Sequence, residues 1–496
     1  MRPLPDGLVV GVDIGTSSSK GVLVDLSGRV LATAVRQHEP SRPRPGWVEM
    51  PAALWWEEFC SIAQELGAVA SKPVVAVGVS GMGPCVALAE EHGEPLRPAI
   101  LYGVDTRATR QVERLTAERG AEEILRRGGS LLSSQAAGPK IAWVAEHEPE
   151  VFARARRLFM PASWLAWSLT GAYVLDHQSA SQCTPLYDIE SQRWNEEWAA
   201  PIVGAIELPE LVWADTVVGR VTPGAAAVTG LPAGIPVVSG TIDAWTEAVS
   251  VGAQAPGDLM LMYGTTMFLV STVERPVRVP ELWSTIGALE GTRSLAGGMA
   301  TSGAITNWVR GLVGSPDFGE LLAEAAASPS GANGLLMLPY FAGERTPVSD
   351  PDARGTVVGL TLDHTRGDLY RAALEATALG VLHNIRTMVA AGAVIDRVVA
   401  VGGGTQGGLW PQIVSDVTGL PQDVTATSIG ASFGAAFLAA TAVASPSIGE
   451  WNPVVQTVEP NRHTAAGYAE LFELYLELYP ATREIAHALA ARQRTG

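Results

Sequence analysis

The chain has 496 residues, of which 47% are hydrophobic and 17% are charged, and its formal net charge at pH 7 is -17. A chain of this length exceeds a single hydrophobic core, and the composition is that of a globular protein. The negative charge argues against nucleic acid or an anionic membrane surface as a partner. ATP is not excluded, because local loops and Mg²⁺ can neutralise its phosphates.

The cysteines and the ends of the chain indicate the compartment. Cys60, Cys85 and Cys183 are odd in number and far apart, so they predict neither a disulfide framework nor a zinc site. The first six residues lack the apolar core of a signal peptide. The small-apolar run at 430–444 is shorter than the ~20 residues of a membrane span. The sequence predicts a cytoplasmic protein with no membrane partner.

The first organised stretch is a hairpin that carries an aspartate and a turn of small residues. Leu8–Val12 predicts a buried strand, and Gly21–Leu26 and Arg29–Val35 predict the next two strands. Asp13 and the turn at 15–17 lie between the first two. Such a turn can present N–H groups to an anion, and a carboxylate beside it can hold Mg²⁺. An ordinary hairpin with an exposed aspartate is the alternative.

A helix and a strand follow, which together predict an α/β layer. Apolar residues from Leu54 to Leu66 recur at helical spacing and predict a helix over 51–66. Val74–Ser80 predicts another buried strand, which runs into Gly81-Met82-Gly83-Pro84. The order strand, helix, strand is typical of an α/β layer. The tryptophan-rich region at 164–213 gives no clear pattern.

A second hairpin repeats the pattern of the first about 250 residues later. Strands predicted at 258–263 and 267–273 flank the turn Gly264-Thr265-Thr266. The recurrence favours a duplicated domain. Further on, the pattern predicts helices at 302–313, 368–390, 410–418 and 431–442, a strand at 398–401, and a C-terminal helix broken by Pro480.

A glycine-rich run at 402–408 follows one of these strands and precedes a helix. Glycines there allow a flat or anionic ligand to approach the backbone. The run lacks the G-x-G-x-x-G dinucleotide spacing, and the chain contains no P-loop. A purely structural turn is the alternative. Three such turns, around Gly15, Gly264 and Gly403, together with Asp13 and Asp243 provide the parts that phosphoryl transfer needs.

With these motifs, the chain resembles the FGGY family of carbohydrate kinases, and most closely its xylulokinase branch. The first phosphate motif is matched by Asp13-Ile14-Gly15-Thr16-Ser17, and the second by Gly240-Thr241-Ile242-Asp243-Ala244. The two family signatures resemble Gly138–Val144 and Gly355–Glu375, and Gly343-Glu344-Arg345-Thr346-Pro347 is a further hallmark. The similarity covers about residues 9–440.

The resemblance implies a fold and a reaction. The fold is the α/β, actin/hexokinase-like ATPase fold, with two ribonuclease-H-like domains, at 1–239 and 240–496, and a cleft between them. The reaction is transfer of the γ-phosphoryl group of ATP, with Mg²⁺, to a hydroxyl of a small ketose or polyol, most simply a pentulose such as xylulose or ribulose. Dimers are common in the family, and a homodimer is left open.

The resemblance also implies roles for individual residues. Asp243 is the catalytic base and contacts the substrate, and Asp13 is the metal residue. The nucleotide and phosphate residues are Gly15, Thr16, Ser17, Lys20, Gly264, Thr265, Thr266, Trp308, Gly403, Gly404 and Gln406. The substrate residues are Met82, Gly83, Asp105 and Asp243.

The substrate side departs from the family pattern. Xylulokinases carry Gln-Met-His where this chain has Met82-Gly83-Pro84, and their Trp-Asn-Asp loop is one residue longer here, at 102–107. Gly83 leaves room, but this wall cannot hydrogen-bond a sugar, so we expect D-xylulose to be a poor substrate, with polar contacts supplied by Asp105. A regulatory or shape-changing ATPase with little kinase activity is the alternative.

Overall fold

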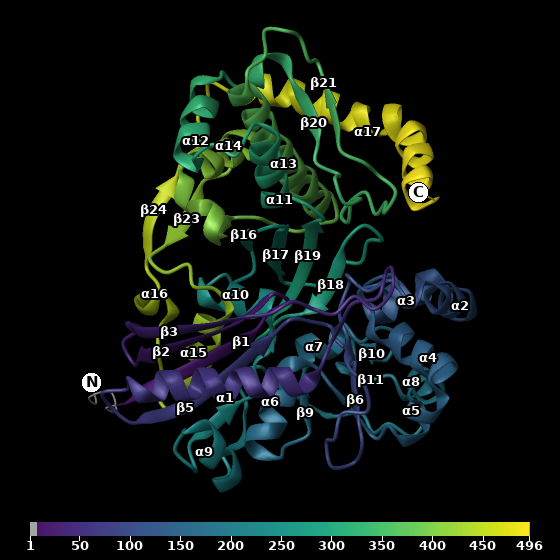
Figure 1. Cartoon of the computed structure of the whole chain (residues 1–496), viewed down its shortest axis with the longest axis vertical. Helices are drawn as coiled ribbons and strands as arrows, with labels where there is room; N and C mark the ends of the chain where they lie inside the picture. Colours follow the sequence, from purple (N-terminus) through teal and green to yellow (C-terminus); the bar gives the residue numbers. More distant parts are fainter. Residues whose placement is uncertain (1–6, 496) are drawn as a thin grey trace. The chain divides into compact units, whose positions relative to one another are not determined.

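The computed structural model describes residues 7–495, so the six residues that argued against a signal peptide lie outside the described part (Figure 1). The chain divides into two compact units. Unit 1 comprises the described part of Met1–Ala255 together with Thr272–Ser294 and Ile429–Pro453. Unit 2 comprises Pro256–Ser271, Leu295–Ser428 and the described part of Val454–Gly496.

The units differ from the predicted division at 239/240 in two respects. Asp243 and the helix that starts there belong to unit 1, and the chain returns to unit 1 for Ile429–Pro453. The physical reason is the helix α15 (Ala431–Thr441), which packs directly on the sheet of unit 1. A single boundary predicted from the order of motifs along the chain cannot show that a later segment folds back into the first unit.

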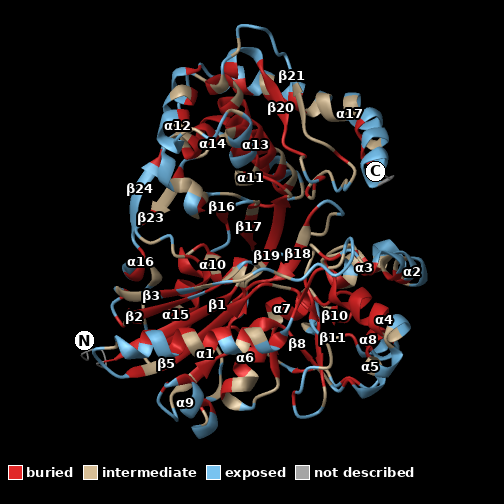
Figure 2. Cartoon of the chain, viewed as in Figure 1, coloured by how far each residue is buried: buried red, intermediate tan, exposed pale blue. Residues whose placement is uncertain are grey.

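The sheet of unit 1 contains the predicted opening hairpin. Its order is β13 (Val217–Arg220), β14 (Pro236–Val238), β5 (Val74–Gly81), β1 (Leu8–Ile14), β2 (Ser18–Asp25) and β3 (Val30–Gln37), and β15 (Thr241–Ile242) also pairs with β5. Strand β1 is antiparallel to β2 and parallel to β5. All seven residues of β1 are buried (Figure 2). The predicted strands are confirmed, with ends displaced by a few residues.

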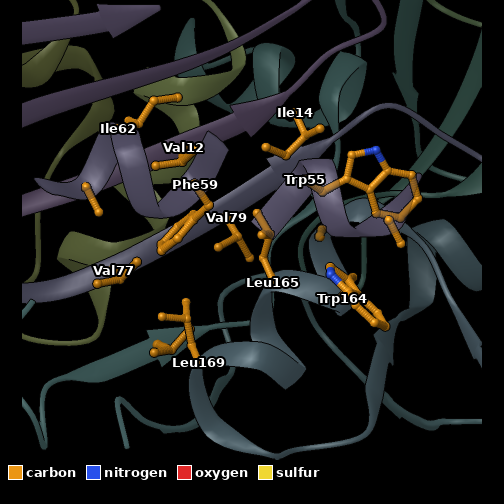
Figure 3. Packing of buried hydrophobic residues seen from close by; sticks show 14 of the residues in the cluster. Val12, Ile14, Trp55, Phe59, Ile62, Val77, Val79, Trp164, Leu165 and Leu169 are labelled. Carbon is orange, nitrogen blue, oxygen red and sulfur yellow. The ribbon is translucent and has the colours of Figure 1, made fainter. Parts of the chain in front are cut away.

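The two faces of β1 have different neighbours. Val10, Val12 and Ile14 belong to the core cluster formed with α1 (Ala52–Ala68) and α6 (Pro161–Thr170), which Figure 3 shows around Phe59 and Leu165. Successive side chains of a strand alternate between faces. Gly11 and Asp13 therefore face the other side, where α15 and α10 (Asp243–Ser250) pack.

Two glycines allow α15 to approach the sheet closely. A Cβ atom on Gly11 would lie 2.1 Å from the carbonyl oxygen of Ser432, and one on Gly78 would lie 1.9 Å from that of Ala435. No side chain fits at either position. The backbone of α15 therefore packs directly against the backbones of β1 and β5. This contact positions α15, and with it α10, against the sheet.

Unit 2 repeats the sheet arrangement of unit 1. Its strands belong to a sheet of order β18 (Trp283–Ile286), β19 (Arg293–Met299), β17 (Met267–Val273), β16 (Asp258–Tyr263), β22 (Arg397–Val401), β23 (Gln422–Thr425) and β24 (Val454–Val458), in which β18 comes from the segment Thr272–Ser294. The first strand, β16, is antiparallel to β17 and parallel to β22, as β1 is to β2 and β5. The duplicated-hairpin prediction is confirmed at the level of topology.

Three helices of unit 2 follow the predicted spans closely, whereas α12 (Phe318–Ala327) was not predicted and the last helix differs from its prediction. They are α11 (Gly303–Leu312), α12 (Phe318–Ala327), α13 (Arg366–Ala390), α14 (Leu409–Thr418) and α17 (Ala465–Thr495). The prediction that Pro480 breaks the last helix is wrong. Asp350 accepts hydrogen bonds from Tyr479 and His487, each at 2.6 Å, and so holds the helix on both sides of the proline. These contacts outweigh the missing N–H.

The tryptophan-rich region folds into short elements of unit 1. They are β9 (Val174–Asp176), α7 (His177–Ser181), β10 (Tyr187–Asp188), β11 (Arg193–Trp194) and α8 (Glu196–Val203), followed by β12 (Glu210–Val212) and α9 (Pro223–Thr229). Before them come β4 (Glu49–Met50), β6 (Ala87–Ala89), β7 (Ala99–Ile100), α2 (Thr109–Arg119), α3 (Ala121–Gly128), α4 (Ala137–His147), α5 (Pro149–Arg154) and β8 (Arg157–Phe159). Strand β18 (Trp283–Ile286) also belongs to unit 1. None of the helices within residues 7–495 has both the length and the apolar character that crossing a membrane requires.

Candidate active site

Three neighbouring strands of unit 1 bring the predicted carboxylates to one end of the sheet. Asp13 on β1 lies opposite Ser80 on β5, and Thr241 on β15 lies opposite the same Ser80. Strand β15 is two residues long, and α10 begins at Asp243 directly after it. The sheet thus places Asp13 near the end of β1 and Asp243 directly after β15, and both of these strands pair with β5.

The carboxyl groups at this end hold their protons more tightly than usual. Burial, and then the charge of Asp243, raise the pKa of Asp13 to about 8. Burial raises the pKa of Asp243 to about 6, and the N–H of Ala244, which donates to its Oδ1 at 2.8 Å, works against this. Lys20 lowers the pKa of Asp13 without cancelling the other two effects. The site is short of positive charge.

Glu247 completes the cluster and was not predicted from the sequence. Burial, and then the charge of Asp243, raise the pKa of Glu247 to about 7. Its position four residues after Asp243 places both on one face of α10, so the spacing was available as a signal. A Cβ atom on Gly430, at the start of α15, would come within 3.2 Å of the Glu247 carboxylate.

Several polar atoms in this region lack a partner, which bears on whether Mg²⁺ fits. Asp13 Oδ1, Ser80 Oγ and Ser432 Oγ are buried and accept or donate no hydrogen bond within residues 7–495. Buried polar atoms normally have partners, and carboxylate oxygen is a ligand that Mg²⁺ prefers. In the same part of the chain no three His, Cys, Asp or Glu side chains form a ready metal site. Mg²⁺ commonly takes one or two carboxylates, waters and substrate phosphates, so Asp13 fits the ion.

The predicted phosphate turn is tight and partly exposed. The N–H of Gly15 donates to the carbonyl of Ser18 at 3.1 Å, and a Cβ atom on Gly15 would lie 2.8 Å from that same oxygen. The hydroxyl of Thr16 lies 2.8 Å from that of Tyr102. Ser17 and Lys20 are exposed. Both of these side chains are accessible to an anionic ligand, whereas Thr16 already has a protein partner.

Met82 and Gly83 do not form the open wall that the sequence suggested. The N–H of Met82 donates to the carbonyl of Ile14 at 2.8 Å, and the Met82 side chain is completely buried in the core cluster. A Cβ atom on Gly83 would lie 2.6 Å from Cγ1 of Ile242. Ile242, next to the predicted base, fills the room that was assigned to a ligand. The buried Met82 side chain gives no support to the predicted substrate contact, which stays a prediction.

Asp105 likewise holds the protein rather than facing outward. Its carboxylate has no exposed surface, pairs with the guanidinium of Arg107 at 2.7 Å and accepts the N–H of Val48 at 2.6 Å. The guanidinium also lies over the rings of Trp47 at 4.2 Å and Trp143 at 5.0 Å. Separating two buried charges that neutralise each other is energetically costly, so the Asp105 side chain remains buried. Asp105 thus fixes the loop at 102–107, and the predicted substrate contact is not supported.

In unit 2, the turn Gly264-Thr265-Thr266 caps a helix. The N–H groups of Ser302 and Ala304 donate to the carbonyl of Thr265, at 3.0 and 3.1 Å, and that of Gly303 donates to the carbonyl of Gly264. The turn is thereby fixed to the start of α11. The side chain of Thr265 is exposed, which leaves it accessible to a phosphate.

The glycine-rich run also belongs to unit 2, where it forms a short 3-10 helix at Gly403–Gly407. The space above Gly403 is open, and Gln406 is exposed. A Cβ atom on Gly404, in contrast, would lie 2.7 Å from the ring of Trp410, so packing explains that glycine. On α11, 45% of Trp308 is exposed beside Phe341. Gly403, Gln406 and Trp308 remain available to a nucleotide.

The two units, each with a hairpin and a parallel strand in the same order, define an α/β protein of the actin/hexokinase-like fold. Residues 8–250 match the N-terminal domain, and residues 259–443 the C-terminal domain, of the FGGY family of carbohydrate kinases. The chain belongs to this family. It is a carbohydrate kinase, a phosphotransferase whose acceptor is an alcohol group.

Similar proteins cover nearly the whole chain. The xylulose kinase of Escherichia coli (strain K12) is 29% identical over 482 residues, which are 95% of this chain and 98% of that protein. The glycerol kinase of Nocardia farcinica is 32% identical over 88% of this chain and 90% of its own. The crystal structure of xylulose kinase from Rhodospirillum rubrum has a TM-score of 0.89 and 33% identity, and covers 97% of this chain and 100% of that one.

Proposed function

We propose that this kinase transfers the γ-phosphoryl group of ATP to a hydroxyl of an uncharged ketose or polyol, with a pentulose such as xylulose or ribulose as the favoured class. The observation that carries the proposal is the pair Asp13 and Asp243, which lie at the ends of two strands of unit 1 that both pair with β5. The similarity to proteins named xylulose kinase supports the pentulose.

Asp243 acts as the general base in this proposal. Its raised pKa, about 6, keeps it ionised at neutral pH while making it a stronger base than an ordinary aspartate. The carboxylate takes the proton of the acceptor hydroxyl as that oxygen bonds to the γ-phosphorus. The bond from this phosphorus to the bridging oxygen breaks, and ADP leaves with the electron pair. The N–H of Ala244 orients the carboxylate.

Asp13 is the residue that would hold Mg²⁺, directly or through a bound water. Bound Mg²⁺ supplies neutralisation of the β- and γ-phosphate charge. The unpartnered Oδ1 of Asp13 supports this assignment. Gly15, Ser17 and Lys20 in unit 1, and Gly264, Thr265, Thr266, Gly403, Gln406 and Trp308 in unit 2, are the proposed contacts to ATP. Thr16 and Gly404 support their neighbours.

Three free cysteines, at 60, 85 and 183, accord with the reducing cytosol that we propose as the location of the protein. Burial raises the pKa of the Cys85 thiol to about 12, so this group is inert.

A coupled assay of ADP release tests the proposed function. Purified protein is supplied with Mg²⁺-ATP and, in turn, with a panel of ketoses, polyols and aldonates, and with no acceptor. We expect release to depend on an uncharged acceptor. Equal release with and without acceptors would indicate a shape-changing ATPase, and no release with any acceptor would indicate a regulator; either result contradicts the proposal.

A further inference from the structure

A small polar cavity in unit 1 is not among the residues that the family motifs mark. Its volume is about 20 Å³, which is room for about one water molecule or one hydroxyl group. It is lined by Ser130, Leu131, Ser133, Gln135, Ala136, Ser181, Gln182, Thr184, Trp283 and Thr285. None of these side chains is ionisable. The wall is therefore built of hydroxyl, amide and apolar groups alone.

Two of the lining residues carry a buried polar atom without a partner. Thr285 is 4% exposed, and its Oγ1 has no hydrogen bond with any residue from 7 to 495. The same holds for Nε2 of Gln182, which is a donor. A buried donor or acceptor left unpaired is costly. The pair thus calls for a small ligand group that both donates and accepts, and a hydroxyl does so.

The cavity is linked to the proposed base through α7. The Thr241 hydroxyl, two residues before Asp243, lies 2.6 Å from the Asp176 carboxylate and 3.0 Å from Oε1 of Gln178 at the start of this helix. Ser181, at its end, lines the cavity. Gln178 and Ser181 are three residues apart on α7, a rise of about 4.5 Å. Helix α7 therefore connects the cavity to β15, the strand that ends directly before Asp243.

Another lining residue, Gln135, is linked to the loop at 102–107. Oε1 of Gln135 accepts the N–H of Gly103 at 3.0 Å, and a Cβ atom on Gly103 would lie 2.6 Å from Cδ of Gln135. Lining residues of the cavity are thus connected both to β15, which ends directly before Asp243, and to the loop at 102–107.

We propose that this cavity binds the hydroxyl of the acceptor that is farthest from the reacting hydroxyl, and that Thr285 and Gln182 determine the length and neutrality of the acceptor. This inference rests on the proposed function. An acceptor that ends in a carboxylate or phosphate is rejected, because the wall offers no counterion and an unpaired buried charge is strongly unfavourable. The terminal hydroxyl of an acceptor that is one carbon shorter does not reach the cavity, which then holds a water molecule.

Calorimetric binding in the absence of ATP tests the cavity separately from turnover. The probes are D-ribulose and D-xylulose, each compared with the four-carbon ketose L-erythrulose. For the better-bound pentulose we expect Thr285→Val and Gln182→Leu to raise Kd about fivefold to tenfold, as for the loss of one hydrogen bond. The Kd of erythrulose should stay unchanged. Thr229→Val, which removes a buried hydroxyl on α9, is the matched control and should change neither Kd.

Equal weakening of the pentulose and of erythrulose would show a structural role for the cavity, and unchanged pentulose binding in both variants would remove it from recognition; each overturns the proposal. If Thr285→Val does not fold, Gln182→Leu carries the comparison. If the wild-type protein binds neither pentulose, the proposal also fails. Failure of the proposed function is seen separately, as absence of acceptor-dependent ADP release by the wild-type protein.

Discussion

At Asp13, burial and like charge both favour the protonated carboxyl. Between the ordinary pKa of 3.8 and the raised value of about 8, the native protein binds more protons than the unfolded chain. The free energy of unfolding therefore falls as the pH rises through this range. In the absence of Mg²⁺ and ATP, the site lowers the stability of the fold, as functional sites often do.

We predict that Asp13→Asn stabilises the ligand-free protein at pH 8 by at least about 1 kcal/mol, because one unit of raised pKa corresponds to about 1.4 kcal/mol. The substitution should also flatten the decrease in stability between pH 5 and 8. Urea unfolding across this range measures both effects. The same variant should have a lower kcat and a weaker dependence on Mg²⁺.

Asp25 is the matched control. Although burial raises its pKa, hydrogen bonds from Ser27 and Arg29 lower it overall, so Asp25→Asn should lose stability at pH 8. A destabilised Asp13→Asn variant with an unchanged Mg²⁺ titration would show that Asp13 is only structural.

The positions of the two proposed carboxylates were accessible from the sequence, whereas the surroundings of several other side chains were not, for physical reasons. Asp13 and Asp243 lie where the motifs implied. Glu247 was missed because its significance depends on the charge of Asp243 and on burial. Met82 and Asp105 were assigned to the substrate because a motif gives the position of a residue but not the direction of its side chain. Both side chains are turned inward, one into the core and one toward Arg107.

At the scale of elements, the loop between β7 and α2 joins the acceptor side to the first phosphate turn. Its buried ion pair holds the loop in place, and Tyr102 at its start contacts Thr16 of the turn. We expect loss of the ion pair to lower the stability of the fold, and loss of the Tyr102–Thr16 contact to weaken nucleotide binding.

We predict that Asp105→Ala destabilises unit 1 by ~1–3 kcal/mol, because the buried N–H of Val48 loses its acceptor and the guanidinium of Arg107 keeps only Glu49 as a carboxylate partner. Chemical denaturation measures this change. Arg126→Ala, which breaks an exposed pair with Glu123, is the control and should change stability by less than ~1 kcal/mol. Normal stability of Asp105→Ala combined with a selective loss of sugar binding would restore Asp105 as a substrate contact.

We predict that Tyr102→Phe raises KM for ATP about fivefold with little change in KM for the acceptor, because one hydrogen bond to Thr16 contributes about 1 kcal/mol. Steady-state kinetics with each substrate varied in turn provides the measurement. An effect confined to the acceptor KM would show that Tyr102 contacts the sugar rather than positioning Thr16.

Sequence periodicity predicted the main strands and helices of both units to within a few residues, because their apolar faces are long and regular. It failed at Pro480, where Asp350 stabilises the helix from a segment 129 residues away. It also gave no structure for 164–213, since the elements there are short and their stability depends on tertiary contacts.

At the scale of the whole molecule, the repeated sheet arrangement accounts for the two groups of predicted residues. Asp243 and Asp13, the proposed base and metal residue, belong to unit 1, whereas the glycine-rich run and the Thr265 turn belong to unit 2. The motif order instead predicted that Asp243 lies in the C-terminal domain, and it did not predict the return of the chain to unit 1 at Ile429–Pro453. That return depends on the backbone contact of α15 with Gly11 and Gly78.

We predict that a screen of ketoses and polyols will give another acceptor a kcat/KM at least ~10-fold above that of D-xylulose, which corresponds to about 1.4 kcal/mol. The reason is that Met82 and Gly83 offer no polar side chain at the position where the xylulokinase pattern implies one. A screen that ranks D-xylulose first by a wide margin would contradict this prediction and leave the kinase assignment intact.

The most direct test of the account is the turnover of Asp243→Asn with the best acceptor from that screen. The asparagine side chain can still accept the N–H of Ala244, but it cannot take the proton of the acceptor. We predict nearly normal ATP binding by calorimetry and a kcat lower by ~10²–10⁴-fold in the coupled ADP assay. A folded variant with near-normal kcat would contradict the assignment of Asp243 as the base that makes this protein a sugar kinase.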